Sequence, residues 1–109
     1  MIRRALAAVA AAAALGLAAP AARAQAADVA AQIKLIETQP ADQDRATWKD
    51  RRRDAARKLG QSKDKRALPV LSKLAETETF DIIGEIAIEG LGALGDPAAA
   101  PVLQKIVAD

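Results

Sequence analysis

The spacing of apolar residues predicts helices along almost the whole chain. Near the start, an uncharged apolar run extends from Ala5 to Ala19. Between residues 28 and 38, apolar residues recur every three or four positions, which places them on one face of a helix. These residues are Val29, Ile33 and Ile36. The polar segment 39–42, with Pro40, ends the pattern. We therefore expect one N-terminal helix followed by a linker.

The rest of the chain contains one pattern twice. A shift of 32 residues aligns residues 47–77 with residues 79–109 without a gap. The identical pairs are Thr47 and Thr79, Ala55 and Ala87, Leu59 and Leu91, Gly60 and Gly92, Asp64 and Asp96, Ala67 and Ala99, Pro69 and Pro101, Val70 and Val102, Leu71 and Leu103, and Lys73 and Lys105. Self-similarity at such a period is typical of stacked units that cannot bury their apolar faces alone. We therefore expect two units, residues 47–78 and 79–109.

Each unit is predicted to form two helices joined by a tight turn. In the first unit, Thr47 is expected to cap the first helix and Gly60 to end it with a positive φ. Asp64 is expected to cap the second helix. Pro69 and Pro101 are expected about one turn inside their helices, where each removes one backbone hydrogen bond and bends the helix start.

Two stretches carry a family resemblance. RRDAARKLG…DKRALPVLSKLAE and EIAIEGLGALGDPAAAPVLQKIVAD resemble HEAT repeats, in particular the short HEAT-like type named after phycobilisome lyases. Arg52 stands where the family usually has an arginine, but the second unit has Gly84 there, and Trp48 and Phe80 stand where an acid is common. The resemblance implies an all-α fold, a short α-solenoid of two HEAT-like helical hairpins preceded by one N-terminal helix. It also implies protein contact as the function.

The first residues have the layout of a signal peptide. MIRR is a basic start, the apolar run follows, and Ala22-Arg23-Ala24 resembles a cleavage site. We expect residues 1–24 to be a signal peptide, residues 25–46 to be the N-terminal helix and linker, and the protein to be periplasmic or secreted. The alternative is an uncleaved membrane anchor. The run is rich in alanine and shorter than a span of about 20 apolar residues, so no stable membrane span is expected after cleavage.

Charge is distributed unevenly. The whole chain has a net charge of +2, but residues 25–109 contain 13 Lys or Arg and 14 Asp or Glu, a net charge of −1. Residues 45–66 contain ten basic and three acidic residues, whereas residues 76–109 contain one basic and seven acidic residues. A basic stripe of Lys49, Arg53 and Arg57 aligns with an acidic stripe of Asp81, Glu85 and Glu89. If the equivalent helices pack side by side, the long side chains of the two stripes can extend toward each other. The alternative is two separately solvated faces.

Several function classes lack their usual residues. The chain contains no His, Cys or Tyr, so common nucleophile, general-base and transition-metal arrangements have no members. No catalytic residue, metal, cofactor or small-molecule substrate is expected, and the absence of cysteine excludes disulfides. An accessory role close to that of a lyase is implied by the family name alone, and a bound tetrapyrrole would support it.

Two surfaces are candidates for binding. The C-terminal helices lack a polar outer face, so we expect them to dock against another protein or a copy of this chain; filling one small core is the alternative. The candidate residues are Ile88, Val102, Leu103, Val107, Lys73 and Lys105. The basic cluster Arg51, Arg52 and Arg53 is a candidate polyanion site. Nucleic acid is not expected as a ligand, because Trp48 alone is available nearby for base stacking and export would remove the protein from the cytoplasm.

Overall fold

The computed structural model describes the backbone of residues 2–108 and the side chains of residues 20–108. It contains the helices α1 (Ile2–Glu37), α2 (Arg45–Gln61), α3 (Ala67–Thr77), α4 (Ile82–Leu94) and α5 (Ala99–Ala108). The described residues contain no strand, which confirms the all-α prediction. Most of the predicted signal peptide precedes the first described side chain.

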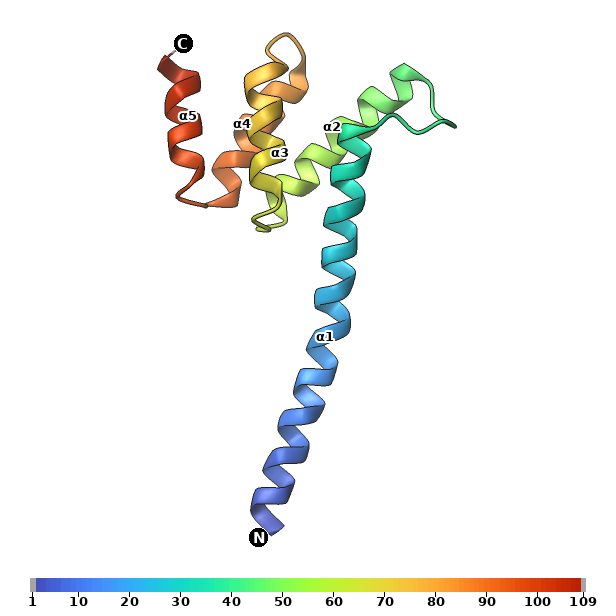
Figure 1. Ribbon diagram of the computed structural model, residues 1–109, viewed down its shortest axis with the longest axis vertical. Coiled ribbons are helices and arrows are strands. Elements are labelled where there is room, and N and C mark those ends of the chain that lie inside the picture. The colour runs from blue at the N-terminus through green and yellow to red at the C-terminus, as the bar shows by residue number, and fades with distance from the viewer. Residues whose placement is uncertain (1, 109) are drawn as a thin grey trace.

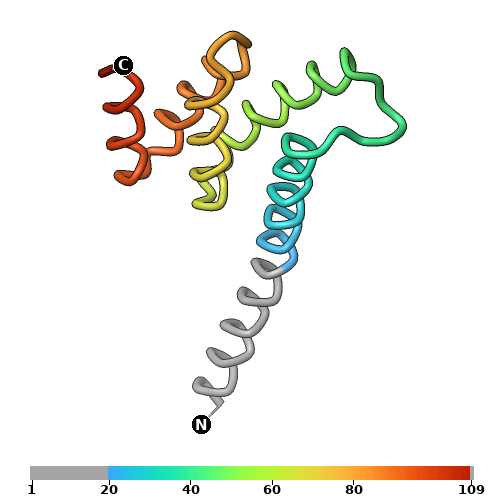
Figure 2. Tube along the Cα trace, turned by 45° about the horizontal axis from the view of Figure 1, so that its top comes forward, coloured from blue at the N-terminus to red at the C-terminus, as the bar shows by residue number. Residues whose placement is uncertain are grey.

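The five helices form two stacked hairpins and one preceding helix (Figure 1). Helices α2 and α3 form the first hairpin, and α4 and α5 form the second. Helix α4 packs against both α2 and α3, so the second hairpin is joined to both helices of the first. The C-terminal part of α1 packs on α2, and Figure 2 shows this arrangement from a second direction. The predicted short α-solenoid is confirmed.

A single apolar core runs through the stack. All five helices contribute to it, and its largest fully buried side chains are Ile36, Leu59, Leu71, Ile83 and Leu91. Four alanines are also buried, and their small side chains let the helices approach closely: Ala55, Ala56, Ala67 and Ala87. No polar or charged residue of the described side chains is fully buried. The fold therefore depends on apolar packing between helices.

Helix α1 continues beyond the N-terminal boundary expected at residue 28. Residues 20–24 are exposed, and the first hydrogen bonds to the hairpins begin immediately after them. The Gln25 amide donates to the Ser62 carbonyl at 3.1 Å, and the Arg66 guanidinium donates to the Ala26 carbonyl at 3.2 Å. Val29 and Ile36 are buried as the apolar spacing predicted. Among the described side chains, we find no helix with the length and apolar character that a bilayer span requires.

The start of α2 differs from the prediction. Asp44, not Thr47, is the N-cap: its carboxylate accepts the Thr47 backbone N–H at 2.7 Å. This hydrogen bond lowers the pKa of Asp44. The prediction of Thr47 as the cap was wrong because the carboxylate three residues earlier already binds the free N–H group at this position.

The second helix of each hairpin begins as a capped turn. The carboxylate of Asp64 accepts the Arg66 N–H at 2.9 Å, and Asp96 accepts the Ala98 N–H at 2.9 Å. Asp64 therefore caps the turn that precedes α3, whereas the N-cap of α3 is Arg66, which makes no side-chain cap hydrogen bond. The prediction that Asp64 caps the helix itself was wrong. Pro69 and Pro101 are each the third residue of their helix. Because the first four N–H groups of a helix have no partner inside it, the predicted loss of a hydrogen bond was wrong.

The prediction that Gly60 ends a helix with a positive φ was also wrong. Gly60 lies inside α2, which continues to Gln61. The positive φ angles belong to Lys63, at 58°, and Gly95, at 66°. These two residues are 32 positions apart, so the turn is repeated although its residue type is not. Gly60 has a different role, which depends on the second hairpin.

Candidate protein-binding surfaces

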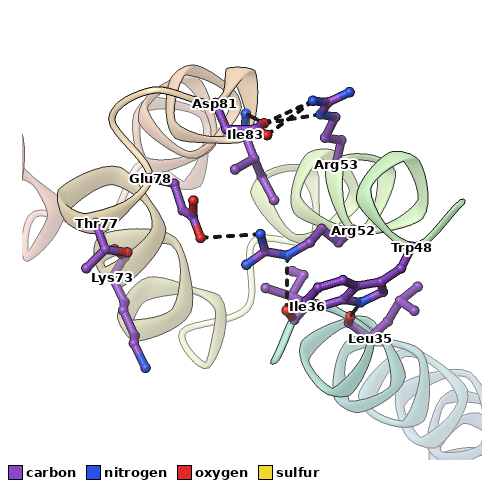
Figure 3. Close-up of polar contacts among 10 residues, drawn as sticks. All are labelled: Leu35, Ile36, Trp48, Arg52, Arg53, Lys73, Thr77, Glu78, Asp81 and Ile83. Carbon is purple, nitrogen blue, oxygen red and sulfur yellow. Dashed lines mark hydrogen bonds and ion pairs between the residues drawn. The ribbon is translucent and has the colours of Figure 1, made fainter. Parts of the chain in front are cut away.

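The end of α1 is fixed to α2 by two side chains, shown in Figure 3. The Trp48 indole N–H donates to the Leu35 carbonyl at 2.7 Å, and the Arg52 Nε–H donates to the Ile36 carbonyl at 3.2 Å. The Arg52 guanidinium carbon also lies 4.9 Å from the centroid of the Trp48 ring. These donors satisfy carbonyl groups at the end of α1 that have no partner within the helix. Trp48 and Arg52 therefore hold α1 in place.

An open groove of about 530 Å³ lies beside this junction, between α1, α2 and α3. Lys73 and Thr77 line its α3 side, and Glu78 accepts a hydrogen bond from Arg52 at 3.3 Å. A second hollow of about 410 Å³ shares Trp48 and Arg52 and extends to Phe80. Two of the polar groups that line the groove, Arg52 and Glu78, therefore bind each other where α1, α2 and α3 meet.

Trp48 and Phe80 are equivalent in the repeat but lie in different surroundings. Trp48 is half-buried, whereas Phe80 is fully exposed. The second repeat has Gly84 in place of Arg52, so it has no guanidinium to stack on the ring. A Cβ atom at Gly84 would lie 2.2 Å from the Glu78 carbonyl oxygen. The α3–α4 connection therefore occupies the space beside α4 that corresponds to the space beside α2 filled by the Arg52 side chain.

An ion pair joins the N-terminal half of α2 to the start of α4 (Figure 3). The Asp81 carboxylate caps α4 by accepting the Ile83 N–H at 2.9 Å. It also accepts two hydrogen bonds from Arg53, each at 3.2 Å. The Ile83 N–H first, and then Arg53, lower the pKa of Asp81. One predicted contact between the basic and acidic stripes is thus confirmed.

The other stripe residues do not form the expected pairs. Arg57 instead binds Asp54 of its own helix, at 2.8 Å. Glu85 and Glu89 are exposed on α4. The acidic stripe therefore has its first carboxylate inside the contact between the hairpins and its other two at the surface.

Close backbone packing continues this contact between the hairpins. A Cβ atom on Gly60 would lie 2.6 Å from the Gly90 Cα atom, so only glycine fits at position 60 without a shift of the helices. Beyond this point, the Lys63 ammonium donates to the Ala93 carbonyl near the end of α4, where a cation is favoured. The order of these contacts shows that α2 and α4 run parallel.

The C-terminal side of the second hairpin exposes positions that the first hairpin buries. Ile88, Leu103 and Val107 are equivalent to Ala56, Leu71 and Ala75, all of which are buried. Ile88 and Leu103 are half-buried, and Val107 is 86% exposed where Ala75 is 4% exposed. We call the surface formed by Glu85, Ile88, Gly92, Leu103 and Val107 the open flank. It is apolar at its centre and acidic at one edge.

The predicted partner-binding residues do not form one surface. Ile88, Leu103 and Val107 belong to the open flank. Val102 is half-buried, as is its equivalent Val70, which lines the groove. Lys73 also lines the groove, and its equivalent Lys105 is exposed on α5. The repeat could have separated these sets and could also have identified Glu85 and Gly92, because Arg53 and Gly60 form the equivalent internal contact.

The arginine cluster is not brought together as a polyanion site. Successive residues of a helix point about 100° apart. Arg51 is exposed, whereas Arg52 and Arg53 are half-buried and bind Glu78 and Asp81. Among the described side chains, no group of three His, Cys, Asp or Glu residues could hold a metal ion.

Two stacked helical hairpins with repeated caps and a close contact between their first helices define a helical repeat protein of the α-solenoid class. The family model for HEAT repeats matches residues 44–109. The chain therefore belongs to the HEAT repeat family. Comparisons with curated proteins and with solved structures found no match. HEAT repeats generally mediate contacts between proteins and are typically not catalytic. The narrower resemblance to the phycobilisome-lyase type stays a prediction.

Proposed function

We propose that this protein is an exported adaptor that binds another protein through the open flank and has no catalysis of its own. The observation that carries this proposal is the difference in burial between equivalent positions. Leu71 and Ala75 are buried by the second hairpin, whereas Leu103 and Val107 have no following hairpin in the described chain. Since a stack normally buries this side of each repeat, a partner on the open flank would complete the pattern.

Export is supported by where α1 begins to contact the hairpins. The predicted cleavage follows Ala24, and the first described hydrogen bond from α1 to the hairpins involves Gln25. Removal of residues 1–24 would therefore retain Val29 and Ile36, which are the buried residues among the described side chains of α1. N-terminal sequencing of the protein from its native cells is expected to begin at Gln25. An intact N-terminus in a cytoplasmic fraction would contradict export.

A photo-crosslinking residue at position 107 tests the binding surface directly. We expect crosslinks from Val107 to a second protein, because this side chain is exposed at the edge of the open flank. The matched control is Glu76, which is exposed on α3 outside the flank. Equal crosslinking from both positions would contradict a site on the flank, and crosslinks from position 107 to this chain alone would show self-association instead.

A further inference from the structure

We propose that the segment bound by the open flank is an α-helix of another protein that continues the stack. This helix places a small residue against Gly92 and a basic residue, nine positions earlier, against Glu85. The inference rests on the proposed function, because it specifies the partner of the same surface. It assumes that the partner packs on the second hairpin in the same way as the second hairpin packs on the first.

Gly92 carries the first step of the inference. It lies inside α4 on an exposed position, and a Cβ atom there would meet no other atom within 4 Å. Glycine in a helix is less favourable than alanine, and nothing in the described chain requires it here. At the equivalent Gly60, glycine is required because the next first helix approaches at Gly90. Gly92 therefore leaves room for the backbone of a following helix.

Charge specifies the second contact. Arg53 of the first hairpin binds Asp81, which lies nine residues before Gly90. The equivalent of Arg53 in the second hairpin is Glu85, which is exposed. A helix that packs in the same register would place its own side chain opposite Glu85. Because the sign at the equivalent position is reversed, the complementary group on the partner is a Lys or Arg.

The apolar part of the flank completes the description of the partner. A Cβ atom on Gly90 would lie 3.1 Å from Leu71 Cδ1, so α4 also rests on α3. The equivalent of Leu71 is Leu103, with Val107 one turn further along α5. A partner helix in the same register would therefore place its small residue close to Leu103 and would cover Val107 as well. Its contact face combines a small residue, flanking apolar residues and one basic residue near its start.

A second copy of this chain fits the flank poorly. Helix α1 already occupies the place on α2 that α3 occupies on α4: Arg52 binds the Ile36 carbonyl at the end of α1, and its equivalent Gly84 lies against the Glu78 carbonyl after α3. A preceding copy would need this place for its own α5. Pairing two flanks in parallel, face to face, would bring together the exposed Glu85 carboxylates of both copies, which is repulsive. The observations therefore favour a different protein.

Two synthetic probes can test this chemistry on the full chain. The acidic probe has the sequence of residues 79–109, and the basic probe carries Asp81→Lys, so that lysine would face Glu85. Because Asp81→Lys also removes the cap of α4 in the probe, the two probes are compared on two receptors, the wild type and Glu85→Lys. The ratio of basic-probe to acidic-probe affinity, measured by fluorescence anisotropy, should be about threefold to tenfold higher for the wild type than for Glu85→Lys. Gly92→Leu should weaken both probes at least about tenfold, without lowering the melting temperature of the receptor.

The outcomes separate this inference from the proposed function. Equal binding of both probes to both receptors, or binding indifferent to Gly92→Leu, would overturn the proposed helix while leaving a partner crosslinked from position 107 in place. Crosslinks shared equally with position 76 would remove the binding surface itself. A dimer seen by sedimentation and lost in Gly92→Leu would identify the occupant as a second copy and overturn the choice of a different protein.

Discussion

The two hairpins have matching sequences but different surroundings, and the difference shows how a repeat depends on its neighbour. Leu71 and Ala75 of the first hairpin are buried, whereas Leu103 is half-buried and Val107 is exposed. The residue types at these positions are apolar in both hairpins. Burial in this fold is therefore decided by the neighbour packed against each hairpin and not by the apolar pattern of the hairpin itself.

The same comparison separates structural residues from candidate binding residues. Gly60 and Gly92 are equivalent, yet the contact with Gly90 requires only the first of them. Arg53 and Glu85 are equivalent, yet among the described residues only Arg53 forms an ion pair. Substitutions at equivalent positions should consequently have unequal effects on stability. Three paired measurements test this, and a fourth measurement tests the ion pair between the hairpins.

The largest difference is expected for a buried charge. Ala75→Asp should lower the free energy of unfolding by at least about 3 kcal/mol, because Ala75 is 4% exposed. Val107→Asp, at the equivalent position, should change it by no more than about 0.5 kcal/mol. Urea unfolding followed by circular dichroism measures both. Similar losses in the two variants would show that the flank is covered within this chain.

Truncation of equivalent leucines should give a smaller difference. Leu71→Ala removes a side chain that is fully buried and should cost about 3 kcal/mol. Leu103→Ala removes a half-buried side chain and should cost about 1 kcal/mol. Thermal unfolding of both variants checks the order. A larger loss for Leu103→Ala would contradict the difference in packing.

The glycine pair should show effects of opposite sign. Gly60→Ala forces a Cβ atom against the Gly90 backbone and should destabilise the protein by about 2 kcal/mol. Gly92→Ala meets no neighbouring atom and should stabilise the helix by about 0.5–1 kcal/mol. Urea midpoints of the two variants on either side of the wild-type value would support this contrast. A destabilised Gly92→Ala variant would count against it.

The smallest effect is expected from the ion pair between the hairpins. The pKa of Asp81 is lowered in the folded chain, so its stabilising contribution is present above the usual aspartate pKa of about 4 and is lost as pH falls through the folded-state value. Acidification should therefore lower the melting temperature of the wild type about 2 °C more than that of Asp81→Asn. The matched control is Glu85→Gln, which removes an exposed carboxylate of the same stripe. Identical profiles for wild type and Asp81→Asn would exclude this coupling.

The repeat made much of the fold predictable from sequence. The shift of 32 residues identified two hairpins, and the apolar spacing identified Val29 and Ile36 as buried. The residues that cap the helices were harder to predict, because several polar residues could cap the same turn. Thr47 and Asp44 are both suitable caps, and only the geometry shows that the Asp44 carboxylate accepts the Thr47 N–H.

The candidate site was predicted in part. Ile88, Leu103 and Val107 were named because they are apolar residues of the second hairpin, and the structure places them on the open flank. Their role in binding stays a prediction. The role of Gly90 could not be predicted from the repeat, because Gly90 aligns with Lys58. Its contact with Gly60 depends on the distance between two helices, which the spacing of residues along one helix does not specify. The role of Gly92 becomes apparent only once that contact is known.

If the open flank binds its proposed partner, the position of α1 would also limit the size of the assembly. With α1 bound by Trp48 and Arg52, one end of the array is closed, and growth can proceed only from the other end. Head-to-tail units with two available ends can polymerise without limit. For a unit closed at one end, the proposal predicts one partner for each copy and no filament.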